Sequence, residues 1–200
     1  PEINYHKHYI NRYAFLFNEY IGNKYVYLPE LSLRHTGQKT FQFDNSHKTI
    51  ALYLGGENKE FRKYPDEYAV QLLRLLNRQG YNLLLIGDEN DNIKHTQYAE
   101  EARIDHLINL TARTTIEGFI NTIANVDLII TIDSSALHIA AAVKTPFIAL
   151  MGLSTSPTST ILPKVPLGRI LKIENNLIRE EDYIRNITPD LILKTVSELI

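Results

Sequence analysis

From residue 48 onward, this 200-residue chain alternates short apolar runs with helical patterns, and this alternation constrains its fold most. The apolar runs are 49–54, 82–86, 126–132 and 146–150. They contain few polar residues, as expected for parallel strands that are covered on both faces. A strand–helix–strand order with short connections predicts a doubly wound, Rossmann-like α/β fold with a parallel sheet and right-handed crossovers.

Helices are expected between these strands, and two further strands are weaker candidates. The expected helices are 65–78, 92–103, 134–143 and one that is capped by Thr114 or Thr115 and runs to 124; the further strands are 107–110 and 169–173. Pro65 is expected in the first turn of the first helix, and Gly80 ends that helix. The helix over 92–103 is polar and is therefore expected to be exposed.

The chain divides into three parts. Residues 1–47 lack the alternation and form a connecting arm, with a helix expected over 9–21 and extended pieces at 25–33 and 41–43. Residues 48–175 form the Rossmann-like domain, and 176–200 contain two helices, at 180–185 and 189–200. This length suits one α/β domain. The only methionine is Met151, so we expect the sequence to be a fragment or a trimmed piece.

The composition excludes several classes of protein and of binding site. With 21 Lys and Arg against 23 Asp and Glu, the net charge of −2 argues against a nucleic-acid-binding protein. The chain has no cysteine, which excludes disulfides and thiolate metal sites. No apolar run approaches the roughly 20 residues of a membrane-spanning helix, and no signal peptide is recognisable. A cytoplasmic protein is expected, with at most peripheral contact with a membrane.

Ligands of parallel sheets bind beyond the carboxyl ends of the strands, which here selects the loops 55–64, 87–91, 133–135 and 152–157. The third loop is the densest in functional groups. Asp133 ends a strand there, Ser134 and Ser135 open a helix, and His138 follows one turn later. Unpaired amides at the start of that helix, together with the hydroxyls, would bind a phosphate.

Simpler interpretations of the same residues stay open. Asp133 and Ser134 could only cap the helix, and His138 could be a hydrogen-bonded core residue. A Ser–His hydrolase is disfavoured, because the nucleophile elbow needs glycines around its serine. In the first loop, Lys59, Arg62 or Lys63 could neutralise a diphosphate or could simply be solvated. The acidic loop 87–91 could hold ribose hydroxyls or cap a helix.

Other classes of site lack their signatures. There is no Gly-x-Gly-x-x-Gly fingerprint and no phosphate-binding lysine loop of the ATPase type. The seven histidines are scattered without the spacing of metal ligands. Paired catalytic carboxylates cannot be assigned.

The combined motifs resemble glycosyltransferase family 9, the ADP-heptose:lipopolysaccharide heptosyltransferases. The family pattern Asp-(Ser/Thr)-Gly-x-x-His, Ala-Ala-Ala and Thr-Pro is similar to 133–138, 140–142 and 145–146 here. Segment 109–115 resembles the family's Leu-Thr-Gly-Lys-Thr-Ser, 63–65 resembles its Lys-x-Trp-Pro, and 8–17 resembles its interdomain helix. The resemblance covers roughly residues 6–173.

The resemblance implies the C-terminal, donor-binding half of a two-domain glycosyltransferase with the GT-B fold. Its donor would be ADP-heptose or a similar nucleotide sugar, without a metal or other cofactor. Residues expected at the donor are Lys63 at the phosphates, Glu89 near the nucleoside, Asp133 toward the loop or the sugar, Ser134, Ser135 and His138 at the diphosphate, and Gly152 beside them. The glycan acceptor and the catalytic base would belong to an absent N-terminal half, so no catalytic residue is named.

Two residues depart from the family pattern. Ser135 replaces the motif glycine, and Tyr64 replaces the tryptophan before the proline. These departures leave two alternatives open: a binding or assembly module that keeps the fold without catalysis, and an enzyme of the same fold that uses another nucleotide sugar.

Overall fold

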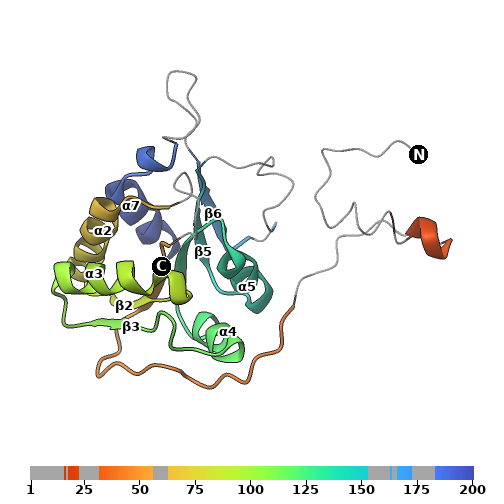
Figure 1. Cartoon of the computed structure of the whole chain (residues 1–200), viewed down its shortest axis with the longest axis horizontal. Helices are drawn as coiled ribbons and strands as arrows, with labels where there is room; N and C mark the ends of the chain where they lie inside the picture. Colours follow the sequence, from red (N-terminus) through yellow and green to blue (C-terminus); the bar gives the residue numbers. More distant parts are fainter. Residues whose placement is uncertain are drawn as a thin grey trace.

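The computed structural model describes residues 16, 18–22, 32–55, 63–152, 163, 166–172 and 183–200. Within them, six parallel strands form a single sheet in the order β3-β2-β1-β4-β5-β6, flanked by helices (Figure 1). The strands are β1 (Thr49–Tyr53), β2 (Asn82–Leu85), β3 (Leu107–Asn109), β4 (Leu128–Ile132), β5 (Phe147–Leu150) and β6 (Gly168–Leu171). The α/β, Rossmann-like fold class predicted from the sequence is confirmed.

The helices between and after the strands have clear boundaries. They are α2 (Asp66–Arg78), α3 (Asn92–Ala102), α4 (Ile116–Ala124), α5 (Ser135–Val143) and α7 (Pro189–Leu199), with short 3-10 helices η2 (Glu89–Asp91) and η4 (Ile184–Asn186). Thr115, Ser134 and Thr188 cap α4, α5 and α7 through side-chain oxygens that accept backbone N–H groups. Local sequence therefore fixes where these three helices begin.

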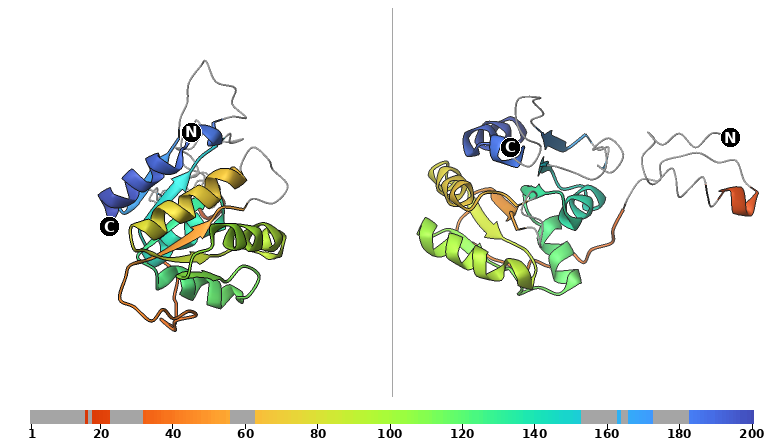
Figure 2. Two further views of the ribbon diagram at one scale, coloured as in Figure 1. Left: turned by 90° about the vertical axis from the view of Figure 1, so that its left-hand side faces the viewer. Right: turned by 45° about the horizontal axis from the view of Figure 1, so that its top comes forward.

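Alternate residues of the central strand β1 feed two separate hydrophobic cores. Ile50 and Leu52 pack with residues of α2 and α7, whereas Ala51 packs with residues of α4 and α5. Successive side chains of a strand point to opposite faces of its sheet, so both faces of β1 are buried. The two views in Figure 2 show helices on both faces of the sheet. This double burial explains the continuous apolar runs in the sequence.

Three details differ from the predictions, and a fourth prediction is described only in part. Pro65 is the N-cap of α2, with ψ of 136°, and the helix begins only at Asp66. Helix α3 is not simply exposed, because His95, Tyr98 and Ala102 are buried against its neighbours. The expected helix over 180–185 lies partly outside the described residues, and 184–186 form the 3-10 helix η4. Of the expected helix over 9–21, only 16 and 18–21 are described, and they are helical.

Residues 32–48 run as an extended segment beside α4 and α5. The N–H of Leu33 donates to Ala142 O at 3.2 Å. Thr36 and Asn121 exchange two hydrogen bonds, of 3.1 and 2.9 Å, and Phe41 and Phe43 pack against the core on this face. This part of the connecting arm is therefore attached to the domain by specific contacts.

Candidate functional site

The carboxyl ends of neighbouring strands bring the predicted loops to one edge of the sheet. Strand β1 pairs with β4 up to Tyr53 and Thr131, and β4 pairs with β5 up to Ile132 and Leu150. Asp133 and Gly152 therefore follow adjacent strands closely. The chain order of the strands reverses between β1 and β4, and such switch points create the crevice in which ligands of doubly wound sheets bind.

Ser134 has a structural role at the start of α5. Its Oγ accepts the N–H of Ala136 at 3.2 Å and lies 2.9 Å from Thr131 Oγ1. Thr131 donates its own proton to Ile132 O, so Ser134 is the donor in the contact between the two hydroxyls. Ser134 therefore caps α5, as the capping interpretation proposed, and it uses its own proton within the loop.

The neighbouring residues leave polar groups exposed at the same helix end. Ser135 and His138 are exposed and Asp133 is half-buried, so the interpretation of His138 as a core histidine is wrong. Ser135 is the first residue of α5 and is absent from the residues with positive φ. Glycine is therefore not needed there for backbone conformation, and the serine adds a hydroxyl to the helix N-terminus.

Helix α5 is held rigidly under this loop by small residues. Ala136, Ala140 and Ala141 are buried against the sheet, with Leu137 beside them. The N–H of Thr145 returns to Ala140 O at 2.9 Å, and its hydroxyl donates to Ile123 O at 2.8 Å. Close packing of a small-residue helix fixes the direction of its N-terminal amides toward the carboxyl edge.

The loop after β2 has a buried carboxylate that the sequence analysis did not single out. Asp91 is buried and accepts the N–H of Asp88 in a reciprocal capping box, whereas Glu89 is exposed. The Asp91 carboxylate lies so close to Gly55 and Gly87 that a Cβ there would be 1.7 and 2.7 Å from its oxygens. Gly55 and Gly87, which each follow a strand by two residues, were the signal that could have identified Asp91.

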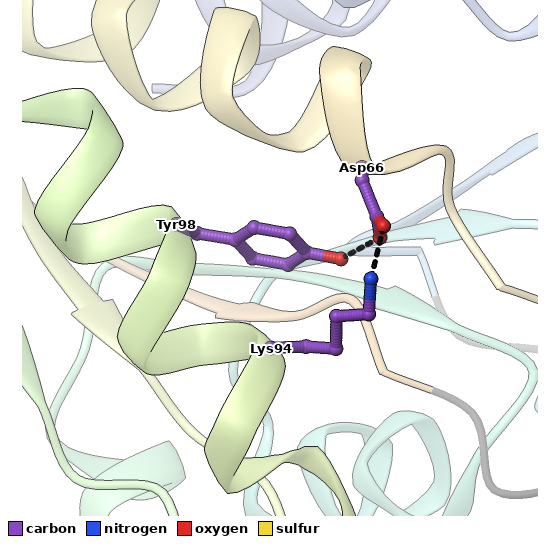
Figure 3. Close-up of polar contacts among 3 residues, drawn as sticks. All are labelled: Asp66, Lys94 and Tyr98. Atoms are coloured by element: carbon purple, nitrogen blue, oxygen red, sulfur yellow. Dashed lines mark hydrogen bonds and ion pairs between the residues drawn. The ribbon is translucent and has the colours of Figure 1, made fainter.

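Lys63 lies at a different part of this edge, in a pocket of about 190 Å³ before α2. Asp66 in that pocket accepts hydrogen bonds from Lys94 and Tyr98, both on α3 (Figure 3). Partial burial alone would raise the pKa of Asp66, but these two hydrogen bonds and the charges of Lys94 and Lys63 outweigh it and lower the pKa. Asp66 therefore joins the Lys63 loop to α3.

The aromatic residue before Pro65 anchors the Lys63 loop from the other side. Tyr64 is buried, and its hydroxyl donates to Ile187 O at 2.9 Å. Burial raises the pKa of Tyr64, so the phenol stays protonated. A tyrosine at this position, where the family pattern has tryptophan, has both an apolar ring and a donor that a backbone carbonyl satisfies.

A second buried polar contact lies behind the turn that follows β3. His95 on α3 is completely buried, with its Nδ1 2.7 Å from Thr111 Oγ1. Burial lowers the pKa of His95 to about 4, with a smaller opposing effect of Asp88, so the imidazole is neutral near pH 7. This pair could not be predicted from the sequence, since neither residue belongs to an apolar pattern or a known spacing.

The predicted donor residues therefore fall into separate groups. Asp133, Ser134, Ser135 and His138 share one turn of chain, and Gly152 lies buried after the adjacent strand. Glu89 follows β2. Lys63 lies in its own pocket, and none of the other predicted donor residues is among the described residues that line that pocket. Lys59, Arg62 and residues 153–157 lie outside the described residues.

The described residues show neither a metal-binding cluster nor a membrane-spanning helix. They contain no group of three or more His, Asp or Glu side chains that could hold a metal ion. In the same part of the chain, no helix combines the length and the apolar character that a membrane span requires. Binding of a donor without a metal stays a prediction.

The chain is similar to known proteins over most of its length. The family described as glycosyltransferase family 9 (heptosyltransferase) matches residues 2–182. Lipooligosaccharide heptosyltransferase 2 of Haemophilus influenzae is 31% identical over 163 residues, which are 76% of this chain and 47% of that protein. Lipopolysaccharide heptosyltransferase 2 of Salmonella typhimurium is 25% identical over 172 residues, which are 80% of this chain and 49% of that protein.

Solved structures share the fold. ADP-heptose lipopolysaccharide heptosyltransferase II of Escherichia coli has a TM-score of 0.72 at 23% identity, covering 88% of this chain and 54% of that one. An E. coli heptosyltransferase solved with ADP has a TM-score of 0.73 at 15% identity, covering 100% of this chain and 59% of that one. The chain spans about half the length of the curated relatives it matches.

Proposed function

Because the chain belongs to glycosyltransferase family 9, we propose that it is the donor-binding half of a glycosyltransferase that takes ADP-heptose or a similar nucleotide sugar. The transfer would serve assembly of lipopolysaccharide or a related surface glycan in the cytoplasm. One observation carries the proposal: the start of α5, with its exposed Ser135 and His138, lies beside the switch point between β1 and β4. Nucleotides of doubly wound sheets bind in that crevice.

The helix end suits a diphosphate leaving group. The N–H groups of Ser135 and Leu137 lie in the first turn of α5, where helical amides have no partner within the helix. Together with the Ser135 hydroxyl and His138, they would bind phosphate oxygens that gain charge as the glycosidic bond breaks. Ser134 would keep the loop in place through its cap. In this arrangement Ser135, which departs from the family pattern, contributes a donor.

The carboxylates after β2 suit the nucleoside. In related sheets an acidic residue at the end of the second strand binds ribose hydroxyls. Glu89 is exposed at this place, and Asp91 lies behind it against Gly55 and Gly87. Lys63, in its pocket next to Asp66, would reach the donor phosphates from the loop after β1. The nucleotide would then extend from β4 across β1 toward β2.

The acceptor side belongs to the remainder of the protein. Relatives of which this chain matches about half carry the name lipopolysaccharide or lipooligosaccharide heptosyltransferase, and we assign the glycan acceptor and the catalytic base to the part of such proteins that this chain does not match. Two alternatives make different predictions. A non-catalytic module with the same fold would bind no nucleotide sugar, and an enzyme for another sugar would prefer another nucleotide.

Calorimetric titration of ADP, ADP-heptose, UDP and GDP into the chain tests the proposal. We expect saturable binding of ADP and ADP-heptose, weakened by both His138→Ala and Lys63→Ala. His106→Ala, at an exposed position before β3, and Lys194→Ala, exposed on α7, are the matched controls and should bind normally. Preference for UDP or GDP would favour the other-donor alternative, and no binding of any nucleotide to folded protein would contradict the proposal.

A further inference from the structure

The turn after β3 is the next feature along the path proposed for the nucleotide. The sheet order places β3 beyond β2, as seen from β1 and β4. A nucleoside diphosphate with its phosphates at α5 and its ribose at the end of β2 therefore points its base toward the turn 110–113. This step depends on the proposed function.

The turn is held in a specific conformation by three contacts. The N–H of Thr111 donates to Asn109 Oδ1 at 3.0 Å, and the N–H of Arg113 donates to Leu110 O at 3.0 Å. Ala112 has a left-handed backbone, with φ of 59°, and its N–H donates to Gly87 O at 3.1 Å. A left-handed alanine is unfavourable by itself, so surrounding contacts must impose the conformation.

His95 supplies the contact from inside the protein. Its Nδ1 bonds the Thr111 hydroxyl at 2.7 Å, while Nε2 has no partner among the described residues. The Nδ1 contact is therefore the polar interaction that ties the imidazole to the turn. His95 also stacks in a tilted geometry on Tyr98, with ring centroids 5.7 Å apart, and Tyr98 donates to Asp66 beside the Lys63 loop.

Helix α3 thus connects two loops that face the proposed nucleotide. Lys94 and His95 each lie about one helical turn before Tyr98, at spacings of four and three residues. Through them α3 contacts Asp66 on one side and Thr111 on the other. We infer that His95 is a positioning residue for the nucleoside, acting through Thr111 on the turn 110–113 without touching the ligand.

A pair of substitutions at each end of the hydrogen bond tests this inference. Asn in place of His95 presents a polar atom near the position of Nδ1, whereas Gln presents one near Nε2. Thr111→Ser keeps the hydroxyl, and Thr111→Val removes it. We expect His95→Gln and Thr111→Val to weaken ADP binding about fivefold to tenfold, and His95→Asn and Thr111→Ser to retain most of it.

Inorganic pyrophosphate separates a positioning role from a general loss of structure. Its competition constant against ADP reports the proposed phosphate contacts, at α5 and Lys63, without those of the nucleoside, and it should stay unchanged in all four variants. Unfolding curves check that each variant is folded at the titration temperature. If a His95 variant is unfolded, the comparison of Thr111→Ser with Thr111→Val tests the inference alone. Equal loss of ADP and pyrophosphate affinity, or unchanged ADP affinity in Thr111→Val, would overturn the inference. Failure of the wild-type chain to bind ADP would instead contradict the proposed function.

Discussion

The two sides of the candidate site are built in different ways. On the α5 side, the polar groups between Thr131 and His138 lie within eight consecutive residues, and the hydrogen bonds of Thr131 and Ser134 stay within this stretch. On the α3 side, contacts join residues far apart in the sequence: Asp66 with Tyr98, His95 with Thr111, and Asp91 with Gly55. The first side is a local structure on the surface, and the second depends on the packed interior.

This difference predicts different responses to substitution. On the α3 side, changes to Asp91, His95, Tyr98 or Thr111 alter buried groups that water cannot satisfy, so they should reduce the stability of the whole domain. On the α5 side, changes to Ser135 or His138 alter exposed groups, so they should affect ligand binding more than folding. Four experiments, in order of decreasing effect, can break or sharpen this contrast.

The largest effect should be a loss of stability in mild acid that depends on His95. Burial lowers the pKa of His95 to about 4, against an ordinary value of 6.5. Between these values the unfolded chain binds one more proton than the folded chain, so the free energy of unfolding falls as the pH decreases. A shift of this size corresponds to about 3 kcal/mol, complete near pH 4.

Urea unfolding between pH 7 and pH 4.5 measures this dependence. His95→Asn should show a shallower decrease than the wild type, because it has no imidazole to protonate. His106→Asn, at an exposed histidine before β3, is the control and should retain the slope of the wild type. Asp66 has a pKa below its usual 3.8 and titrates under this window. Identical slopes for all three proteins would show that His95 is not protected from protonation.

The second effect concerns the close approach of Asp91 to β1. Gly55→Ala places a Cβ 1.7 Å from Asp91 Oδ1, so we expect a loss of about 2 kcal/mol in chemical denaturation. Gly118→Ala is the control, since its Cβ would meet only Thr114 and Thr115 side chains, at 3.4 Å, on helix α4. It should be neutral or stabilising by up to about 1 kcal/mol. Equal effects of the two substitutions would mean that Asp91 moves easily.

The third effect is the loss of a helix cap on the α5 side. Ser134→Ala removes the acceptor of the Ala136 N–H and the partner of Thr131, which should cost about 1 kcal/mol. Ser134→Thr keeps a hydroxyl at the cap and should recover most of the loss. A Ser134→Ala effect as large as that of Gly55→Ala would erase the contrast between the two sides.

The smallest effect on folding should come from substitution of Ser135, the residue after the cap. Ser135→Ala removes an exposed hydroxyl, so the free energy of unfolding should change by less than about 0.5 kcal/mol. If this hydroxyl binds phosphate as proposed, ADP affinity should nevertheless fall about fivefold in the calorimetric titration. Ser135→Gly, which restores the residue of the family pattern, distinguishes the hydroxyl from the backbone. Loss of stability without loss of affinity would contradict our assignment.

The contrast between local contacts on the α5 side and long-range contacts on the α3 side also explains which features could be predicted from the sequence. Strands such as β4 were recognisable because both of their faces are buried, which requires continuous apolar runs. The loop from Asp133 to His138 was recognisable because its groups are consecutive. Asp91 and His95 were not identified, since each acts through partners that only the folded sheet brings near. Only three of the eleven residues of α3 are buried, so its polar composition concealed its inner face.

The central position of β1 also has a consequence for the order of folding during synthesis. Strand β1 pairs with β2, made about thirty residues later, and with β4, made about eighty residues later. A ribosome therefore releases the β1-β2-β3 half first, with one edge of β1 still open until β4 emerges. Such an open, apolar edge can pair with other chains. Chaperone demand during translation should peak between these two events.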